Sequence, residues 1–179
     1  MFQYILPISL FFLGAEAVCP STPNAVWVQL GSQCYHISQR KMSSMKGGQE
    51  YCWGIGGNLA EIMSEEEETF LDSFLLEGIS YWTGLSDEGH EGIVLLTHVP
   101  PMLTMFVILG IYRWEENHQE AIYTNWAFNE PTNTLEENCV RKTYRVGYVG
   151  WHDVNCDQTW EEGFGEMHAL CQTPPTSKF

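Results

Sequence analysis

The first clear pattern of hydrophobic and polar positions is a pair of short alternating runs at residues 27–30 and 34–37. Gly31-Ser32 separates them, and a turn between two alternating runs predicts a β-hairpin. A helical pattern follows, for which Ser43 or Ser44 supplies a capping residue and Gly56-Gly57 a stop signal. We therefore expect a hairpin and then a helix that extends through Cys52.

A second helix is predicted by a capping box. Ser64 stands three residues before Glu67, so the serine can cap the first turn while the glutamate reaches back. Hydrophobic residues then recur at helical spacing, at positions 70, 71, 74 and 75. The acidic run 65–68 lies in the first turn, where the helix dipole favours negative charge. We interpret this run as helix-start chemistry rather than as a metal site.

Short strand-like runs dominate the rest of the chain. They lie at residues 58–62, 81–85, 112–114, 139–142, 150–153 and 169–171. In the second run two aromatic residues precede Gly84 and Leu85, which we interpret as core packing rather than ligand contact. Two early helices and several late strands predict an α+β domain. The 179 residues suffice for one domain with a full core.

An apolar segment, residues 93–110, interrupts this spacing. It holds no charged residue apart from His98 when protonated, and removing it joins Gly92 directly to Ile111. Three interpretations stay open: a transmembrane helix, an insertion that packs on the domain, and a retained non-coding stretch. The length suffices for a membrane span, but Pro100-Pro101 would break a helix in its middle. In the other two cases the segment would be an apolar liability on the surface.

The first seventeen residues have the pattern of a secretory signal peptide. Residues 4–13 are mostly apolar, and the small residues of Ala15-Glu16-Ala17 permit cleavage after Ala17. An N-terminal membrane anchor is disfavoured because the apolar run is shorter than the roughly 20 residues that span a bilayer. We therefore expect a secreted, extracellular protein whose mature domain comprises residues 18–179.

Charge and cysteine content agree with an exported binding domain. The formal net charge is −15 at pH 7, which disfavours nucleic acid and anionic membranes as partners and attracts divalent cations. Six cysteines follow the leader, and an even number in an exported chain predicts disulfides, with about fifteen possible pairings. The sequence lacks a nucleophile elbow, a paired nucleophile and a phosphate-binding glycine loop, so we do not expect an enzyme.

A series of short signatures resembles the C-type lectin domain family. In chain order they are Tyr81-Trp82-Thr83-Gly84-Leu85-Ser86-Asp87, Asn125-Trp126, Glu130-Pro131-Thr132-Asn133, Glu136-Glu137-Asn138-Cys139 and Trp151-His152-Asp153, closed by Cys156 and Cys171. The resemblance covers residues 19–172 and is greatest to perlucin-like and other secreted invertebrate lectins. It implies a C-type lectin-like α+β fold, with two helices flanking short antiparallel sheets and a long calcium-binding loop.

The resemblance also selects one disulfide pairing. It pairs Cys52 with Cys171 and Cys139 with Cys156, and it pairs Cys19 with Cys34 as in the family's long form. The first of these bonds would close a long loop and so restrict the unfolded chain most.

The family's calcium ligands map onto five residues of this chain. The resemblance places both the metal site and the sugar site at Glu130, Thr132, Glu137, His152 and Asp153. Calcium takes six to eight oxygen ligands, which suits the carboxylates of this set. In the family the proline that corresponds to Pro131 follows a cis bond.

Two of the five positions depart from the family's pattern. Thr132 offers a short hydroxyl where an amide or carboxylate is expected, and the imidazole of His152 is a poor calcium ligand. Asn133 can supply an amide oxygen beside the loop. A working site and a silent site on the same fold therefore both stay open.

The resemblance implies calcium-dependent recognition of glycans, in which Glu130 favours mannose-type sugars. Microbial recognition in innate immunity would be the corresponding role. The alternative is an acidic, perlucin-like extracellular matrix protein that contacts calcium carbonate mineral during biomineralisation and has a degenerate sugar site.

Overall fold

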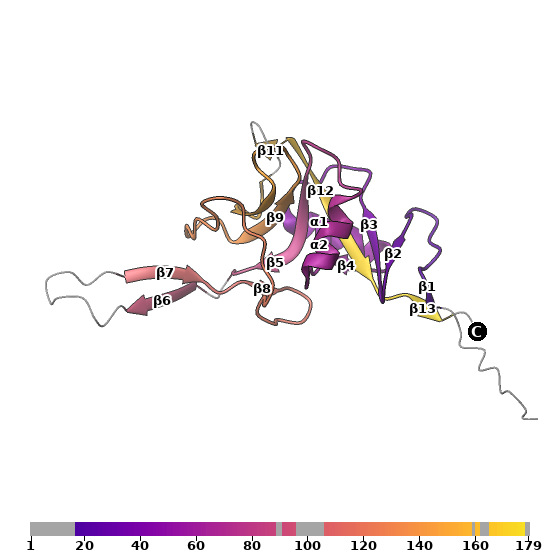
Figure 1. Ribbon diagram of the computed structural model, residues 1–179, viewed down its shortest axis with the longest axis horizontal. Helices are drawn as coiled ribbons and strands as arrows, with labels where there is room; N and C mark the ends of the chain where they lie inside the picture. The colour runs from indigo at the N-terminus through magenta and orange to yellow at the C-terminus, as the bar shows by residue number, and fades with distance from the viewer. Residues whose placement is uncertain (1–16, 89–90, 96–105, 159, 162–164, 178–179) are drawn as a thin grey trace, which may run out of the picture.

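The computed structural model describes residues 17–88, 91–95, 106–158, 160–161 and 165–177 (Figure 1). The expected leader lies outside the described residues except for Ala17. Within these ranges, no helix has both the length and the apolar character needed to cross a membrane.

Two helices and thirteen strands make up the described fold, which is of the predicted α+β class. The helices are α1 Met45–Gly54 and α2 Glu65–Asp72. The strands are β1 Ala17–Val18, β2 Val28–Leu30, β3 Gln33–Ile37, β4 Asn58–Leu59, β5 Ser80–Ser86, β6 Glu91–Leu95, β7 Phe106–Gly110, β8 Arg113–Trp114, β9 Cys139–Thr143, β10 Gly150–Val154, β11 Trp160–Glu161, β12 Gly165–Thr173 and β13 Thr176–Ser177. The strand expected at 58–62 ends at Leu59, and the strand expected at 112–114 begins one residue later.

Nine strands form one sheet. Its main path runs β10-β9-β5-β12-β3-β2, while β4 and β11 also pair with β12 and β8 pairs with β5. Strands β5 and β12 run parallel, and the other pairs are antiparallel. A separate pair, β1 with β13, brings the two ends of the described chain together.

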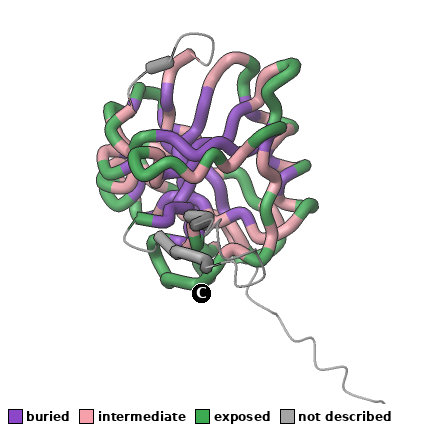
Figure 2. The backbone as a smooth tube through the Cα atoms, turned by 90° about the vertical axis from the view of Figure 1, so that its left-hand side faces the viewer, coloured by how far each residue is buried: buried purple, intermediate pink, exposed green. Residues whose placement is uncertain are grey.

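The sheet separates two hydrophobic cores. Successive side chains of a strand point to opposite faces, and on β5 Tyr81 packs with Leu71 of α2 while Trp82 packs with Met45 and Cys52 of α1. Both aromatic side chains are fully buried. Buried strands run through the middle of the molecule and exposed segments surround them (Figure 2). The prediction that residues 81–85 serve core packing is confirmed.

Both helices begin at the predicted caps. The hydroxyl of Ser44 accepts a hydrogen bond from Gly47 N at 2.9 Å, and that of Ser64 accepts one from Glu67 N at 3.2 Å. The carboxylate of Glu67 reaches back, as in a capping box, but accepts from Met63 N at 2.6 Å. The reciprocal bond is therefore formed one residue before the cap.

All three predicted disulfides are present: Cys19–Cys34, Cys52–Cys171 and Cys139–Cys156. The second joins α1 to β12 across a sequence separation of 119 residues. It therefore fixes the first helix to the central strand of the sheet.

The apolar segment contributes a β-hairpin. Its strands β6 and β7 pair in register from Glu91↔Gly110 to Leu95↔Phe106. The interpretation as a transmembrane helix is therefore wrong for these residues, because they form two antiparallel strands that pair with each other. The two strands contact the domain at Gly110 and otherwise extend away from the body (Figure 1), so packing of the segment on the domain stays a prediction. Pro100-Pro101 lies outside the described residues, and the interpretation as a retained stretch stays open.

Candidate functional site

The candidate site lies where the long loop 115–138, between β8 and β9, meets β10. Two backbone hydrogen bonds dock the loop on this strand: Trp151 N donates to Asn125 O at 2.8 Å, and Ala127 N donates to Trp151 O at 2.9 Å. The docked segment leads directly into the Glu130-Pro131 peptide, which is cis. The loop and the strand thus bring residues 130–137 and 152–153 together.

Asp153 is the centre of the site. Its carboxylate is buried and accepts hydrogen bonds from Thr132 N at 2.8 Å and Asn133 N at 2.7 Å. The hydroxyl of Tyr112, from the segment before β8, donates to it at 3.1 Å. Asp153 therefore fixes the position of the loop as well as being a candidate ligand.

Thr132 links two carboxylates. Its hydroxyl donates to Glu137 Oε2 and lies 3.3 Å from Asp153 Oδ2. Thr134 donates a second hydroxyl hydrogen bond to the same oxygen of Glu137, at 2.8 Å. The short side chain that departs from the family's pattern thus bridges two of the predicted ligands.

Glu130 and His152 contact each other. Glu130 Oε1 lies 3.0 Å from His152 Nδ1, and the other ring nitrogen lies 3.3 Å from the carbonyl oxygen of Tyr148. Both ring nitrogens face oxygen acceptors, so a protonated ring can donate to both. His152 therefore occupies one oxygen of Glu130.

The second oxygen of Glu130 is buried and receives no hydrogen bond from a described N–H or O–H group, while the Glu130 carboxyl group interacts with that of Asp153. Burial raises the pKa of Glu130 to about 8, helped by the neighbouring Asp153 and the charge of Glu137 and opposed by Arg141. Carboxylates crowded in a poorly solvated place repel one another, and a proton or a cation relieves that repulsion.

The donor set fits a hard cation in its chemistry. Thr132 links the carboxylates of Glu137 and Asp153, and the Glu130 carboxyl group interacts with Asp153, so three carboxyl groups lie together. Within the described ranges, however, His, Cys, Asp and Glu side chains form no group of three or more already arranged around a metal. The contact between His152 and Glu130 accounts for part of this difference. The five predicted residues are therefore neighbours, but they do not form a finished cage.

The base of the hairpin reaches the same loop. Gly110 N donates to Asn133 Oδ1 at 3.0 Å, so the amide oxygen proposed to supplement Thr132 is already engaged. A Cβ atom at position 110 would lie 2.1 Å from Asp87 Oδ2 and 2.9 Å from Asn133 Oδ1. The close approach therefore requires glycine.

A buried ion cluster next to the site was not predicted. Glu68, in the first turn of α2, accepts from the ammonium group of Lys142 and from Trp151 Nε1, and Asn125 donates to it at 2.9 Å. Lys142 also lies 2.6 Å from Asp72. From the sequence, Glu68 was interpreted only as one of four acidic residues in the first turn of a helix. The one available signal was its position on the same helix face as Leu71 and Asp72.

Solved structures of known fold superpose on the chain. They include a mouse scavenger receptor C-type lectin carbohydrate-recognition domain (TM-score 0.64, 20% identity, 88% of this chain and 100% of that one). The lectin domain of murine dendritic cell inhibitory receptor 2, solved with an N-glycan, gives a TM-score of 0.62 at 24% identity. The match covers 87% of this chain and 99% of that one. A calcium-independent type II antifreeze protein gives a TM-score of 0.62 at 19% sequence identity, and the match covers 90% of this chain and 98% of that one. At these identities the likeness shows the fold alone.

Curated relatives agree with the fold. C-type lectin domain family 4 member D of Homo sapiens is 27% identical over 84% of this chain. The chain matches 59% of the length of that relative, which is less than two thirds of it. A perlucin-like protein of Mytilus galloprovincialis is 24% identical over 86% of this chain and 90% of its own length. The Lectin C-type domain matches residues 41–161, which is more than half of the chain. This family has a binding fold and is not a family of enzymes, and the chain belongs to it.

Proposed function

We propose that this protein is a secreted, calcium-dependent carbohydrate-binding lectin. The observation that carries the proposal is the grouping of Glu130, Glu137 and Asp153 at the docked loop, where Thr132 joins Glu137 to Asp153 and the Glu130 carboxyl group interacts with Asp153. A bound calcium ion would neutralise these carboxylates and offer open coordination positions to sugar hydroxyls.

The residues of the site would have different roles in holding the loop, the cation and the sugar. Asp153 would hold the loop through its backbone hydrogen bonds and face the cation with its buried carboxylate. Glu130 and Glu137 would supply oxygens to the cation and accept hydrogen bonds from the sugar. Thr132 would complete the set once its hydroxyl turns from bridging two carboxylates. His152 would leave Glu130 or bind through nitrogen.

Glycans are the proposed partners, with mannose-type sugars favoured by Glu130 at the first position of the loop. Support comes from the structural neighbour solved with an N-glycan. Recognition of microbial glycans in innate immunity is the corresponding role.

Calcium titration followed by thermal unfolding tests the proposal. A ligand that binds only the folded form raises the melting temperature with its concentration, so we expect a calcium-dependent rise in the wild type. Glu137→Ala should abolish the rise, and Glu136→Ala, one residue away and exposed, is the matched control. His152→Asn should strengthen the response because it frees Glu130 Oε1 and adds an oxygen ligand.

Sugar binding needs a separate measurement. The protein should elute from a mannose-bearing resin with EDTA or with free mannoside, and galactoside should compete less. A wild-type melting curve that does not respond to calcium would show a silent site on a lectin fold.

A second candidate function is favoured by charge. The net charge of −15 and the likeness to a perlucin-like protein support an acidic matrix protein that contacts calcium carbonate. Adsorption to carbonate crystals would then be unaffected by free sugar and by Glu137→Ala. The lectin proposal expects both treatments to matter for glycan binding.

A further inference from the structure

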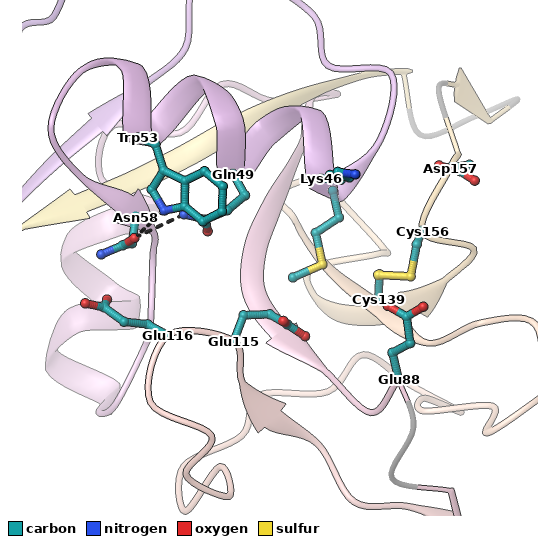
Figure 3. Close-up of a pocket in the computed structure, with 11 residues that line it drawn as sticks. Lys46, Gln49, Trp53, Asn58, Glu88, Glu115, Glu116, Cys139, Cys156 and Asp157 are labelled. Carbon is teal, nitrogen blue, oxygen red and sulfur yellow. Dashed lines mark hydrogen bonds between the residues drawn. A yellow bond between two sulfur atoms is a disulfide. The ribbon is translucent and has the colours of Figure 1, made fainter.

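A cavity lined by other residues than the candidate calcium ligands lies beside helix α1. Its volume is about 420 Å³, within the range of roughly 300–1,000 Å³ typical of ligand pockets. Helix α1 forms one wall, while the end of β5 and the segment after β8 form the opposite wall (Figure 3). The Cys139–Cys156 disulfide and Met45 provide apolar surface between them.

An oriented tryptophan borders this cavity. Trp53 is 63% exposed although it is a large aromatic residue. Its indole N–H donates to Asn58 Oδ1 at 2.9 Å, and Gln49 Nε2 donates to the same oxygen at 3.1 Å. Gln49 Oε1 in turn accepts from Leu59 N at 3.1 Å. These bonds hold the ring beside the opening while its faces remain available.

The charged side chains around the cavity are mainly carboxylates, of which Glu115 already accepts a hydrogen bond from the Ser86 hydroxyl. Four of the lining residues are acidic (Glu88, Glu115, Glu116 and Asp157) and one, Lys46, is basic. In Figure 3 Glu115 and Glu116 extend from the wall opposite Trp53. Glu116 also contributes, after burial, to the raised pKa of the neighbouring Glu61. An ionised carboxylate only accepts hydrogen bonds, so the ligand must be a donor.

We propose that this cavity binds the arginine side chain of a basic peptide or protein segment. A guanidinium group carries five N–H donors and no acceptor, which complements the carboxylates. Its planar, weakly hydrated face stacks on aromatic rings, and Trp53 presents such a face. The strongly negative chain would also draw a basic partner towards it.

Three alternatives fit less well. A neutral sugar pairs best with a balanced set of donors and acceptors, whereas four carboxylates, which only accept, outnumber the single ammonium group of Lys46 in the lining. A metal ion would need clustered ligands, and the described residues form no such group of three or more. A lysine ammonium group is more strongly hydrated and gains less from the apolar wall.

The test uses the peptide acetyl-Gly-Arg-Gly-Arg-Gly-amide and its lysine and citrulline counterparts. Binding is measured by calorimetry and by the indole N–H signal of Trp53 in ¹⁵N NMR, with EDTA present. EDTA removes calcium, so this experiment succeeds or fails independently of the proposed lectin activity. We expect the arginine peptide to bind and to shift the Trp53 signal, the lysine peptide to bind less tightly, and the citrulline peptide not to bind.

Variants locate the binding. Trp53→Ala should weaken it about tenfold, and Glu116→Gln should weaken it about fivefold. Lys46→Met should strengthen it, because the one basic group of the lining is removed. Phe128→Ala and Glu77→Gln, exposed positions outside the lining, are the matched controls and should have no effect. Equal weakening by Glu77→Gln would reduce the effect to general charge attraction and overturn the proposal, as would equal binding of the citrulline peptide.

Discussion

Two groups of carboxylates lie close together in this molecule and are stabilised in different ways. In the buried ion cluster, Glu68 and Asp72 both contact the ammonium group of Lys142. At the candidate site, Glu130, Glu137 and Asp153 are held by hydroxyl, amide and imidazole groups. The first group carries its own fixed cation, and the second leaves a buried oxygen without a donor among the described residues.

The difference separates a structural role from a binding role. A buried charge whose partner belongs to the fold contributes to one arrangement of the chain and is poorly placed to exchange ligands. At the candidate site the carboxylates share weaker donors, and burial together with the neighbouring Asp153 and Glu137 raises the pKa of Glu130, so these groups can exchange their donors for an external cation. Substitutions in the two groups should therefore behave differently.

The largest effect is expected from Lys142→Met. Its ammonium group is fully buried, and removing one partner of a buried pair costs about 3–5 kcal/mol because the remaining charges stay desolvated. Urea unfolding measures the loss. The exposed pair of Lys41 with Glu166 is the control, for which Lys41→Met should have little effect because solvent screens the pair. Similar losses in both variants would contradict the structural role of the cluster.

Asp153→Asn should have a smaller effect on stability and a complete effect on the calcium response. One carboxylate oxygen becomes an amide NH2 group, which then faces either the N–H of Thr132 or the N–H of Asn133. Leaving such a buried donor unsatisfied costs about 1–3 kcal/mol. Comparison with the wild type in EDTA measures this cost, and the unfolding free energy of the variant itself should be the same in calcium as in EDTA. A calcium response that survives would exclude Asp153 as a ligand.

Deletion of residues 93–110 should change the free energy of unfolding by about 1 kcal/mol or less. Loop length has a weak effect, and among the described residues one hydrogen bond between the segment and the rest of the domain is lost. That bond is the one from Gly110 to Asn133. The strands β6 and β7 pair only with each other in the described sheets. Fold and calcium response should therefore persist, and solubility should rise because apolar surface is removed. If the domain unfolds, the hairpin belongs to its core.

The smallest effect on stability is expected from the titration of His36. This histidine is buried, and its two hydrogen-bond partners among the described residues are not carboxylates. Its ring nitrogens contact the carbonyl of Val26 and the hydroxyl of Tyr51, both at 2.9 Å. Burial lowers the pKa of His36 below its usual 6.5, against the opposing hydrogen bond to Val26. The unfolded chain binds the extra proton first, so the stability contribution is present above pH 6.5 and is lost as pH falls through the folded pKa.

The measurement is unfolding free energy between pH 7 and pH 5. His36→Gln should reduce the loss on acidification, whereas the exposed His118→Gln should leave the profile unchanged. An identical slope in wild type and His36→Gln would show that other groups titrate in this range.

Local rules predicted most of the framework. Ser44 and Ser64 bond to nearby amides, so both helix starts could be predicted from a few neighbouring residues. The three disulfides came from the family resemblance and not from spacing, because six cysteines alone leave the pairing open. The α+β class followed from the order of helical and alternating patterns.

Long-range contacts explain what could not be predicted. Glu68 looked like a helix-start acid because its partner Lys142 lies 74 residues away in sequence. Asn133 looked available as a ligand until the fold brought Gly110 against it. The strands of the apolar segment pair through their backbones, a preference that a uniformly apolar sequence does not distinguish from a helix.

The short pairing of β1 with β13 bears on how the domain can be attached to a surface. The two ends of the described chain emerge together at one end of the molecule, and the hairpin, whose base contacts the candidate loop, projects from the opposite end (Figure 1). A tether, tag or sensor chip joined to either end would therefore leave the binding loop facing solvent. Several copies tethered side by side would present their loops in one direction and gain avidity on a repetitive surface without any new contact.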